Sequence, residues 1–301
     1  MRISERVRRV LSYYDSESPA VLTNIARMLM HGSLAGTGKL LILPVDQGFE
    51  HGPTKSFESN PSAYDPCYHY ELALNCGFSA YAAHVGNLEC GAREYAGSIP
   101  TILKLNGSTA LHPKASTPNQ AVTASVKDAL YLGCVAVGFT IYPGSGEFLS
   151  MVREARELVR EAKSYGLASV IWSYPRGGDL SKEGETAVDV VAYAAYIAAS
   201  IGANVIKVKL PTANVERDAT KCDVSSLSQR VSYVKKSCFA GRRIVVFSGG
   251  SVKTDSELLD EILAIKSGGG DGSIIGRNSF QREAASASSL MAKISEIYAA
   301  A

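Results

Sequence analysis

Eight short runs of apolar, β-forming residues recur along this 301-residue chain, and longer segments of helical period separate them. The runs cover residues 40–44, 78–83, 101–105, 135–139, 168–172, 205–209, 244–247 and 273–275. Regular alternation of strand and helix predicts βα units, in which parallel strands are connected by helices that cover the sheet.

A chain of this length suits either two ordinary domains or one α/β barrel with an extension. No linker rich in Pro, Ser or Gly divides the eight units. The predicted fold is therefore a single (β/α)8 TIM barrel over residues 39–301, preceded by an N-terminal helical extension over residues 1–38. A doubly wound open sheet is the alternative, but no GxGxxG follows the first run; Asp46, Gln47 and Gly48 stand there instead.

Local signals support the helices between the runs. Apolar residues repeat on one face over 148–162 and over 188–199. A second helix of the extension is expected to begin near Pro19, because proline suits the first helical turn, and to end before the glycines that follow residue 31. Glycines that tolerate positive φ stand just before five of the runs, namely Gly77, Gly133, Gly166, Gly202 and Gly272.

The bulk composition excludes several classes of partner. With 31 basic and 29 acidic residues the formal net charge is +2, which gives no overall field suited to nucleic acid or to an anionic membrane. No apolar run reaches the roughly 18 residues of a membrane span. The six cysteines lack CxxC or CxxH spacing, which favours a reducing, cytoplasmic setting over a zinc or redox site. The arginine-rich start raises the question of a transit peptide, but residues 3–11 fit an amphipathic helix.

The sixth run carries the strongest chemical signal. Its period of two places Lys207 and Lys209 on one face, opposite Ile206, Val208 and Leu210. If the apolar face packs on helices, both lysines point into the barrel, where burial and mutual repulsion favour a neutral, nucleophilic amine. The alternative is a lysine that reaches from the strand end to solvent.

Other strand ends add groups at the same mouth, since parallel barrels keep their active sites there. Trp172 and Tyr174 share a face after the fifth run, and a phenol there can transfer protons or serve as core filler. Asp46 ends the first run and can orient hydroxyls or face a lysine. Glu50 and His51 follow it, but one histidine is weak evidence for a metal, and none is expected.

The last two runs end in loops typical of phosphate binding, containing Ser248, Gly249 and Gly250, then Gly276 and Arg277. The alternative is a pair of ordinary turns with a surface arginine. On the third run, Lys104 alternates inward with Asn106 and its role stays open. The remaining histidines form no recognisable constellation; they are His31, His69, His84 and His112.

The chain resembles the archaeal-type class I fructose-1,6-bisphosphate aldolases, which also occur in bacteria, in the segments LAGTGKLLILPVDQGFEHGP, VIWSYPRG, GANVIKVK, VVFSGG and IIGRNSFQ. The resemblance implies that Lys207 forms the Schiff base, that Tyr174 is the general acid/base, and that Asp46 lies near the imine. It further implies a pocket wall at Trp172, an auxiliary Lys209, and phosphate or substrate contacts at Ser248, Gly249, Gly250, Gly276, Arg277, His51 and Arg176.

The expected activity is therefore metal-independent, reversible cleavage of fructose 1,6-bisphosphate through an imine on Lys207, with no cofactor and with a sugar phosphate as the small-molecule partner. The resemblance also implies a homo-oligomer. Residues 210–213 depart from the Tyr-Thr-Gly stretch that archaeal members often carry there, which leaves the substrate range open. Alternatives are a Schiff-base transaldolase acting on another sugar phosphate, a non-catalytic phosphosugar-binding barrel, and a metal-dependent aldolase or hydrolase.

Overall fold

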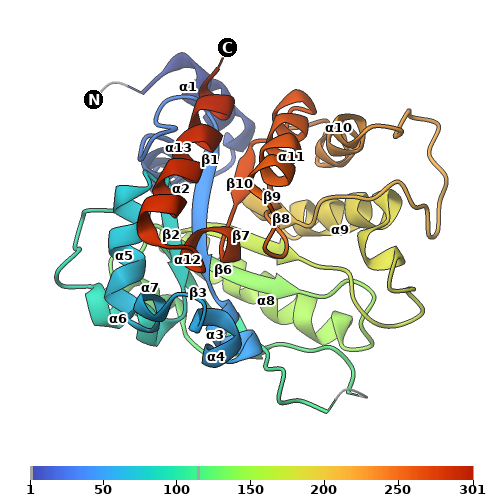
Figure 1. Ribbon diagram of the computed structural model, residues 1–301. Coiled ribbons are helices and arrows are strands. Elements are labelled where there is room, and N and C mark those ends of the chain that lie inside the picture. Colours follow the sequence, from blue (N-terminus) through green and yellow to red (C-terminus); the bar gives the residue numbers. More distant parts are fainter. Residues whose placement is uncertain (1–2, 114–115, 301) are drawn as a thin grey trace.

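The computed structural model describes residues 3–113 and 116–300. Residues 1 and 2 of the predicted extension and residues 114, 115 and 301 of the predicted barrel lie outside the described part. Eight parallel strands close into a barrel in the order β1-β2-β3-β6-β7-β8-β9-β10 and back to β1. Helices surround this barrel, as Figure 1 shows. The predicted (β/α)8 barrel is confirmed, and no open doubly wound sheet is present among the described residues.

The barrel strands are β1 (Leu40–Val45), β2 (Ala80–Ala83), β3 (Thr101–Lys104), β6 (Ala136–Ile141), β7 (Ala168–Ser173), β8 (Val205–Val208), β9 (Ile244–Ser248) and β10 (Gly272–Ile274). The helices are α1 (Glu5–Leu11), α2 (Pro19–Leu29), α3 (Gln47–His51), α4 (Pro53–Phe57), α5 (Pro66–Asn75), α6 (Val85–Gly91), α7 (Val126–Tyr131), α8 (Phe148–Ser164), α9 (Val188–Ser200), α10 (Leu227–Ser237), α11 (Asp255–Ser267), α12 (Arg277–Phe280) and α13 (Ala284–Ala299). Three short 3-10 segments cover Ser12–Tyr14, Pro61–Tyr64 and Gly184–Thr186.

Alternation along the strands divides the core into two layers. Outward residues such as Leu41, Leu43 and Ile206 pack on the surrounding helices. Inward residues such as Ile42 and Val170 fill the barrel. Since each strand contributes to both layers, a polar side chain on an inward position is held inside the barrel unless it lies near a strand end.

The extension closes the N-terminal end of the barrel. Val7, Val21 and Ile25 from α1 and α2 are buried against the inward barrel residues in one continuous apolar cluster. The Tyr14 hydroxyl donates to the Asn204 carbonyl at 2.5 Å and accepts from the Ile244 N–H at 2.8 Å, which connects it to the starts of β8 and β9. One end of the barrel is therefore sealed, and the site lies at the other.

Turn signals read from the sequence agree with the backbone. Helix α2 begins at Pro19, with the Ser18 side chain accepting from Val21 N–H. The five glycines predicted before strands all have positive φ. At Gly272 an added Cβ would lie 1.9 Å from the Leu40 carbonyl oxygen, so the close approach of β10 to β1 also requires glycine there.

The sequence patterns did not predict one pair of strands that is added to the barrel. After β3 the chain forms a small antiparallel pair, β4 (Asn106–Gly107) with β5 (Ala121–Val122), before it enters α7. This excursion stands at the C-terminal end of the strands, beside α3, where Ala110 N–H donates to the Glu50 carbonyl at 2.7 Å. None of the described helices is both long and apolar enough for a membrane span.

Candidate active site

A cavity of about 280 Å³ opens at the C-terminal ends of the barrel strands. Loops after β1, β7, β8, β9 and β10 all contribute to its wall. The lining residues are Pro44, Asp46, Gln47, Glu50, His51, Tyr174, Arg176, Lys207, Lys209, Ser248, Gly249, Gly250, Ser251, Ile274, Gly276 and Arg277. Apart from Trp172, every residue singled out from the sequence as a site residue therefore faces this one space.

Lys207 lies on β8 at an inward position and is 4% exposed. The register pairs it with Trp172 on β7, and its Nζ lies 5.2 Å from the centre of the indole ring. Trp172 does not line the cavity; it is buried beneath the amine. The ring fits because the residue that faces it on β6 is Gly138, which has no side chain. A Cβ added at Gly138 would lie 2.5 Å from the Trp172 ring. The indole thus supports the amine from the barrel interior.

The surroundings of Lys207 favour a neutral amine. Burial lowers its pKa to about 8 from the ordinary 10.5, although the negative charges of Asp46 and Glu50 act in the opposite direction. The positive charges of Lys104 and Arg277 lower the pKa further. Near neutral pH an appreciable fraction of Lys207 is then unprotonated, as a nucleophile that attacks a carbonyl must be.

The expectation that Lys209 supplies the second cation beside Lys207 is wrong. Strand β8 ends at Val208, so the alternation stops before Lys209. Its amine forms an ion pair with Glu185 at 3.2 Å at the cavity rim, and its side chain is 26% exposed. The lysine that shares the barrel interior with Lys207 is Lys104 on β3, whose Nζ lies 5.5 Å from the centre of the same Trp172 ring.

Asp46 and Tyr174 flank the amine. Asp46 follows β1 and is 5% exposed; burial would raise its pKa, but Lys207 and Lys104 outweigh that effect and lower it. The Lys207 Nζ lies 5.5 Å from the centre of the Tyr174 ring. Burial and the nearby carboxylates raise the pKa of Tyr174 well above 10, while Ser248 acts in the opposite direction. The site thus holds an ionised carboxylate and a protonated phenol.

The loops after β9 and β10 are held together by Asn278. Its amide donates to the carbonyls of Gly249 at 3.2 Å and Ser251 at 2.9 Å, and its oxygen accepts from Lys253 N–H at 3.0 Å. Arg277 donates to the Gly250 carbonyl at 2.9 Å. This arrangement places a guanidinium beside backbone of low steric bulk, which suits a phosphate group.

A second guanidinium, that of Arg176, lines the same cavity. The Arg176 guanidinium lies 4.9 Å above the centre of the Tyr142 ring and is held there by a 3.4 Å hydrogen bond to the phenol. Burial lowers the pKa of His51, and the positive charges of Arg277, Lys55 and Arg176 add to the effect. Two guanidinium groups and a nucleophilic amine that line one cavity fit a ligand with two anionic groups and a carbonyl.

Comparison with known proteins places this geometry in a family. A model of the DeoC/LacD family aldolases matches residues 40–282, which include every barrel strand. The chain belongs to the DeoC/LacD family of aldolases. The resemblance to archaeal-type class I members is also confirmed by the relatives and solved structures of this family.

Two relatives bear names that state an activity. The chain is 39% identical to "Fructose-bisphosphate aldolase class 1" of Thermoproteus tenax over 249 residues, which cover 82% of this chain and 86% of the relative. It is 35% identical to "Probable fructose-bisphosphate aldolase class 1" of Chlamydia muridarum over 310 residues, covering 97% and 88% of the two chains.

Solved structures agree with these relatives. An archaeal fructose-1,6-bisphosphate aldolase with its catalytic Lys bound to the carbinolamine intermediate aligns with a TM-score of 0.78 at 34% identity, covering 92% of this chain and 99% of that one. The fructose-bisphosphate aldolase from Slackia heliotrinireducens aligns with a TM-score of 0.82 at 27% identity, covering 99% and 89%.

Sequence reasoning did not assign a role to two groups near Lys207, namely Lys104 and His84. Lys104 is 1% exposed and donates to the Asn106 carbonyl at 2.9 Å. His84, which belonged to no constellation in the sequence, packs against Phe49 in a tilted arrangement with the ring centres 4.6 Å apart, and burial with the Lys104 charge lowers its pKa to about 4. The sequence indicated that Lys104 points inward with Asn106, but it did not show that Lys104 and His84 lie close enough for their charges to interact.

The described residues offer no group of three or more His, Cys, Asp or Glu side chains arranged to hold a metal ion. The donor set of the cavity is instead a lysine, a phenol and two carboxylates beside cationic groups. Such a set is equipped for imine formation and proton transfer.

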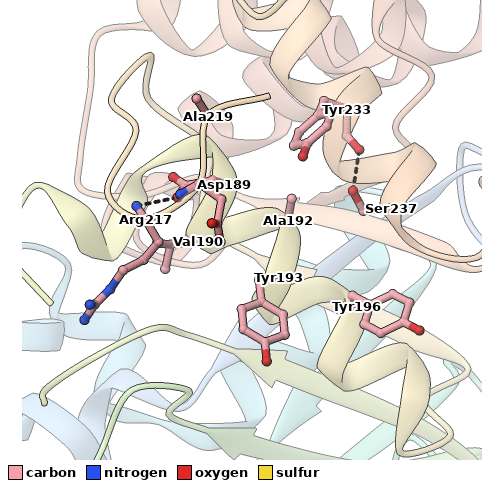
Figure 2. A pocket seen from close by; sticks show the side chains of 10 residues that line it. Asp189, Val190, Ala192, Tyr193, Tyr196, Arg217, Ala219, Tyr233 and Ser237 are labelled. Atoms are coloured by element: carbon pink, nitrogen blue, oxygen red, sulfur yellow. Dashed lines mark hydrogen bonds between the residues drawn. The ribbon is translucent and has the colours of Figure 1, made fainter. Parts of the chain in front are cut away.

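A second hollow of about 380 Å³ lies outside the barrel of this aldolase, between α9 and α10, as Figure 2 shows. There the buried Asp189 accepts N–H groups from Glu216, Arg217 and Asp218 at 3.1, 2.7 and 2.9 Å. Asp189 thereby holds the loop that follows β8. Its carboxylate is occupied by backbone N–H groups, so Asp189 is not a free acid in this hollow.

Proposed function

We propose that this protein is a class I fructose-1,6-bisphosphate aldolase, which reversibly forms dihydroxyacetone phosphate and glyceraldehyde 3-phosphate through an imine on Lys207. The observation that carries the proposal is the buried Lys207 amine with its pKa near 8, in one cavity with Asp46 and Tyr174. The names of the relatives and of the solved structures support the same activity.

The reaction follows from the chemistry of these groups. The neutral Lys207 amine attacks the C2 ketone, and loss of water from the carbinolamine gives an iminium ion. The C4 hydroxyl loses its proton, the C3–C4 bond breaks, and its electron pair moves into the iminium to form an enamine. Protonation at C3 and hydrolysis then release dihydroxyacetone phosphate and restore the amine.

Tyr174 and Asp46 have different parts in this scheme. A phenol of raised pKa is protonated in the resting site, so Tyr174 is suited to donate a proton to the departing C2 oxygen and to exchange protons later. Asp46 is ionised and buried, and its charge stabilises the iminium that develops at Lys207. Neither step requires a metal ion or a cofactor.

The ends of the substrate are assigned from the positions of the cations. We assign the phosphate next to the ketone to Ser248, Gly249, Gly250, Gly276 and Arg277, and the far phosphate to His51, Arg176 and Lys209. Trp172 then supports Lys207 from below. Arg277 and Arg176 are the strongest supports for this orientation, since one guanidinium is fixed by a hydrogen bond to Gly250 after β9 and the other by a hydrogen bond to Tyr142 after β6.

A cleavage assay tests the proposal. Purified protein is given fructose 1,6-bisphosphate, and triose phosphate is measured with and without chelator, beside Lys207→Met. We expect equal rates with and without chelator and no cleavage by the variant. Chelator-sensitive cleavage would favour the metal-dependent class. Cleavage only of other sugar phosphates would favour a transaldolase, and retained binding without turnover of any of them would favour a binding protein.

The setting of the enzyme is part of the same proposal. All six cysteines are free, which supports a reducing, cytoplasmic location. We also propose that the protein forms a homo-oligomer. Its chain is divided into an extension over residues 1–38 and a barrel over residues 39–301.

A further inference from the structure

A second carboxylate stands in the cavity beside Asp46. Glu50 lies on α3 one helical turn after Asp46, and its N–H donates to the Asp46 carbonyl at 3.2 Å. Side chains four residues apart share one helix face, so both carboxylates point to the same side. Both line the cavity that contains Lys207. The scheme proposed above uses only Asp46.

The Glu50 carboxylate lacks a strong partner within the protein. Its side chain is 17% exposed, and its one ion contact is with His51 Nε2 at 3.8 Å, beyond hydrogen-bond distance. Over residues 3–113 and 116–300, no N–H or O–H group donates to it, and no lysine or arginine nitrogen lies within 4 Å. Since a mostly buried carboxylate without donors is costly, a ligand that brings donors would complete this part of the site.

Arg176, to which the far phosphate was assigned, acts on the charge of Glu50, which associates Glu50 with that end of the substrate. Glu50 precedes His51, and its charge acts on Tyr142, the phenol on which Arg176 is stacked. Under the orientation proposed above, this end receives the aldehyde half of the sugar phosphate. That half carries hydroxyl groups between the broken bond and the far phosphate, and a hydroxyl is the donor that Glu50 lacks.

The pKa values of the two carboxylates are shifted in opposite directions. Burial raises the pKa of Glu50, and the neighbouring Asp46 raises it further, while Lys104, Arg176 and Lys207 act in the opposite direction. The pKa of Asp46 is lowered instead. Asp46 is therefore the anion beside the imine, and Glu50 is the carboxylate left to accept a hydrogen bond from the ligand.

We propose that Glu50 binds a hydroxyl group of the aldehyde half of the substrate and so selects phosphorylated aldehydes that carry a hydroxyl beside the carbonyl. This inference rests on the proposed function and adds a specificity residue to it. It predicts that Glu50 matters for the step that uses the aldehyde and is dispensable for the chemistry of dihydroxyacetone phosphate alone.

The test separates two half-reactions in Glu50→Gln and Glu50→Ala, with Glu58→Gln as the matched control, because Glu58 is an exposed acid just after α4. Exchange of the C3 proton of dihydroxyacetone phosphate with deuterium reports imine and enamine formation without an aldehyde. Condensation is then measured with glyceraldehyde 3-phosphate and with 3-phosphopropanal, which keeps the phosphate but lacks the hydroxyl.

At about pH 9, where Lys207 is largely unprotonated with or without the Glu50 charge, we expect both Glu50 variants to exchange protons within about twofold of wild type and to lose roughly 10- to 100-fold in kcat/KM with glyceraldehyde 3-phosphate, the range of a hydrogen bond to a charged group. With 3-phosphopropanal they should match wild type. A parallel loss of proton exchange, an equal loss with both aldehydes, or no loss would overturn the inference. Failure of the proposed function is distinguishable, since wild-type protein would then show no exchange.

Discussion

At the scale of single residues, the reactivity of Lys207 depends on charges that lie far from it in the sequence. Lys104 and Lys207 lie near the same indole ring, 5.5 and 5.2 Å from its centre. Both are buried, so the repulsion between their charges is weakly screened. Lys104 thus helps to keep its partner unprotonated, a role the sequence suggested for Lys209.

Lys104→Met should therefore change the pH dependence of catalysis. Without the Lys104 charge the pKa of Lys207 rises above about 8. Because the unprotonated amine is the active form, the inflection of kcat/KM moves to higher pH, and the rate at pH 7 falls while the rate at high pH recovers. A pH series of fructose 1,6-bisphosphate cleavage measures this shift.

Lys209→Met is the control for that series. The Lys209 charge is paired with Glu185 at the cavity rim. The inflection of kcat/KM in Lys209→Met should therefore stay at the wild-type pH even if substrate binding weakens. An unmoved inflection in Lys104→Met, or an equal shift in both variants, would contradict the role assigned to Lys104.

At the scale of elements, packing between neighbouring strands fixes the support beneath the amine. Gly138 on β6 leaves room for the Trp172 ring, and an added Cβ would meet two ring carbons at 2.5 and 2.8 Å. The indole cannot move without disturbing Lys207, with which it is paired across β7 and β8.

Gly138→Ala should therefore destabilise the fold by about 1–3 kcal/mol, the usual cost of overpacking a core. It should also reduce activity, because the ring is displaced toward Lys207. Urea unfolding gives the first quantity and the cleavage assay the second. Gly86→Ala is the matched control: an added Cβ there has nothing within 4 Å in helix α6, so neither quantity should decline. Equal stability of the two variants would refute the packing argument.

Asn278→Ala should loosen the loop after β9, since it removes three hydrogen bonds from a residue that is 1% exposed. We expect KM for fructose 1,6-bisphosphate to rise about tenfold, as hydrogen bonds that hold the phosphate loop are lost. Imine formation with dihydroxyacetone, which has no phosphate, should remain near the wild-type rate. Equal losses with both compounds would show that Asn278 does not act through the phosphate loop.

Much of this element-level organisation was readable from the sequence. All eight strand runs are strands of the barrel, because parallel strands buried on both faces form continuous apolar runs. The placement of Lys209 failed because a period of two holds only while the strand continues, and β8 ends one residue earlier. Alternation placed Lys104 inside the barrel without a role, and His84 was missed, because the sequence does not reveal which side chains meet across the barrel interior.

At the scale of the whole molecule, the extension and the barrel share one core. Tyr14 is 2% exposed, and its hydroxyl satisfies a carbonyl before β8 and an N–H at the start of β9. The active site is at the opposite end of the same strands. Residues in the extension should therefore govern the stability of the molecule without taking part in its chemistry.

Tyr14→Phe should reduce the free energy of unfolding by about 1–3 kcal/mol, because it leaves two buried backbone groups without their partner. Activity per folded molecule should be unchanged. Tyr13→Phe is the control, since no described residue forms a hydrogen bond with the Tyr13 hydroxyl. Urea unfolding followed by Trp172 fluorescence and by circular dichroism should give one common transition. Two separate transitions would mean that the extension and the barrel unfold independently.

The central claim is that Lys207 is the covalent nucleophile of this aldolase. Borohydride reduction in the presence of dihydroxyacetone phosphate converts the imine to a stable secondary amine, which peptide mass analysis can locate. We predict one adduct per chain, on Lys207, and none in Lys207→Met. An adduct on Lys104 or Lys209, or the absence of any adduct from protein that cleaves fructose 1,6-bisphosphate, would contradict the claim.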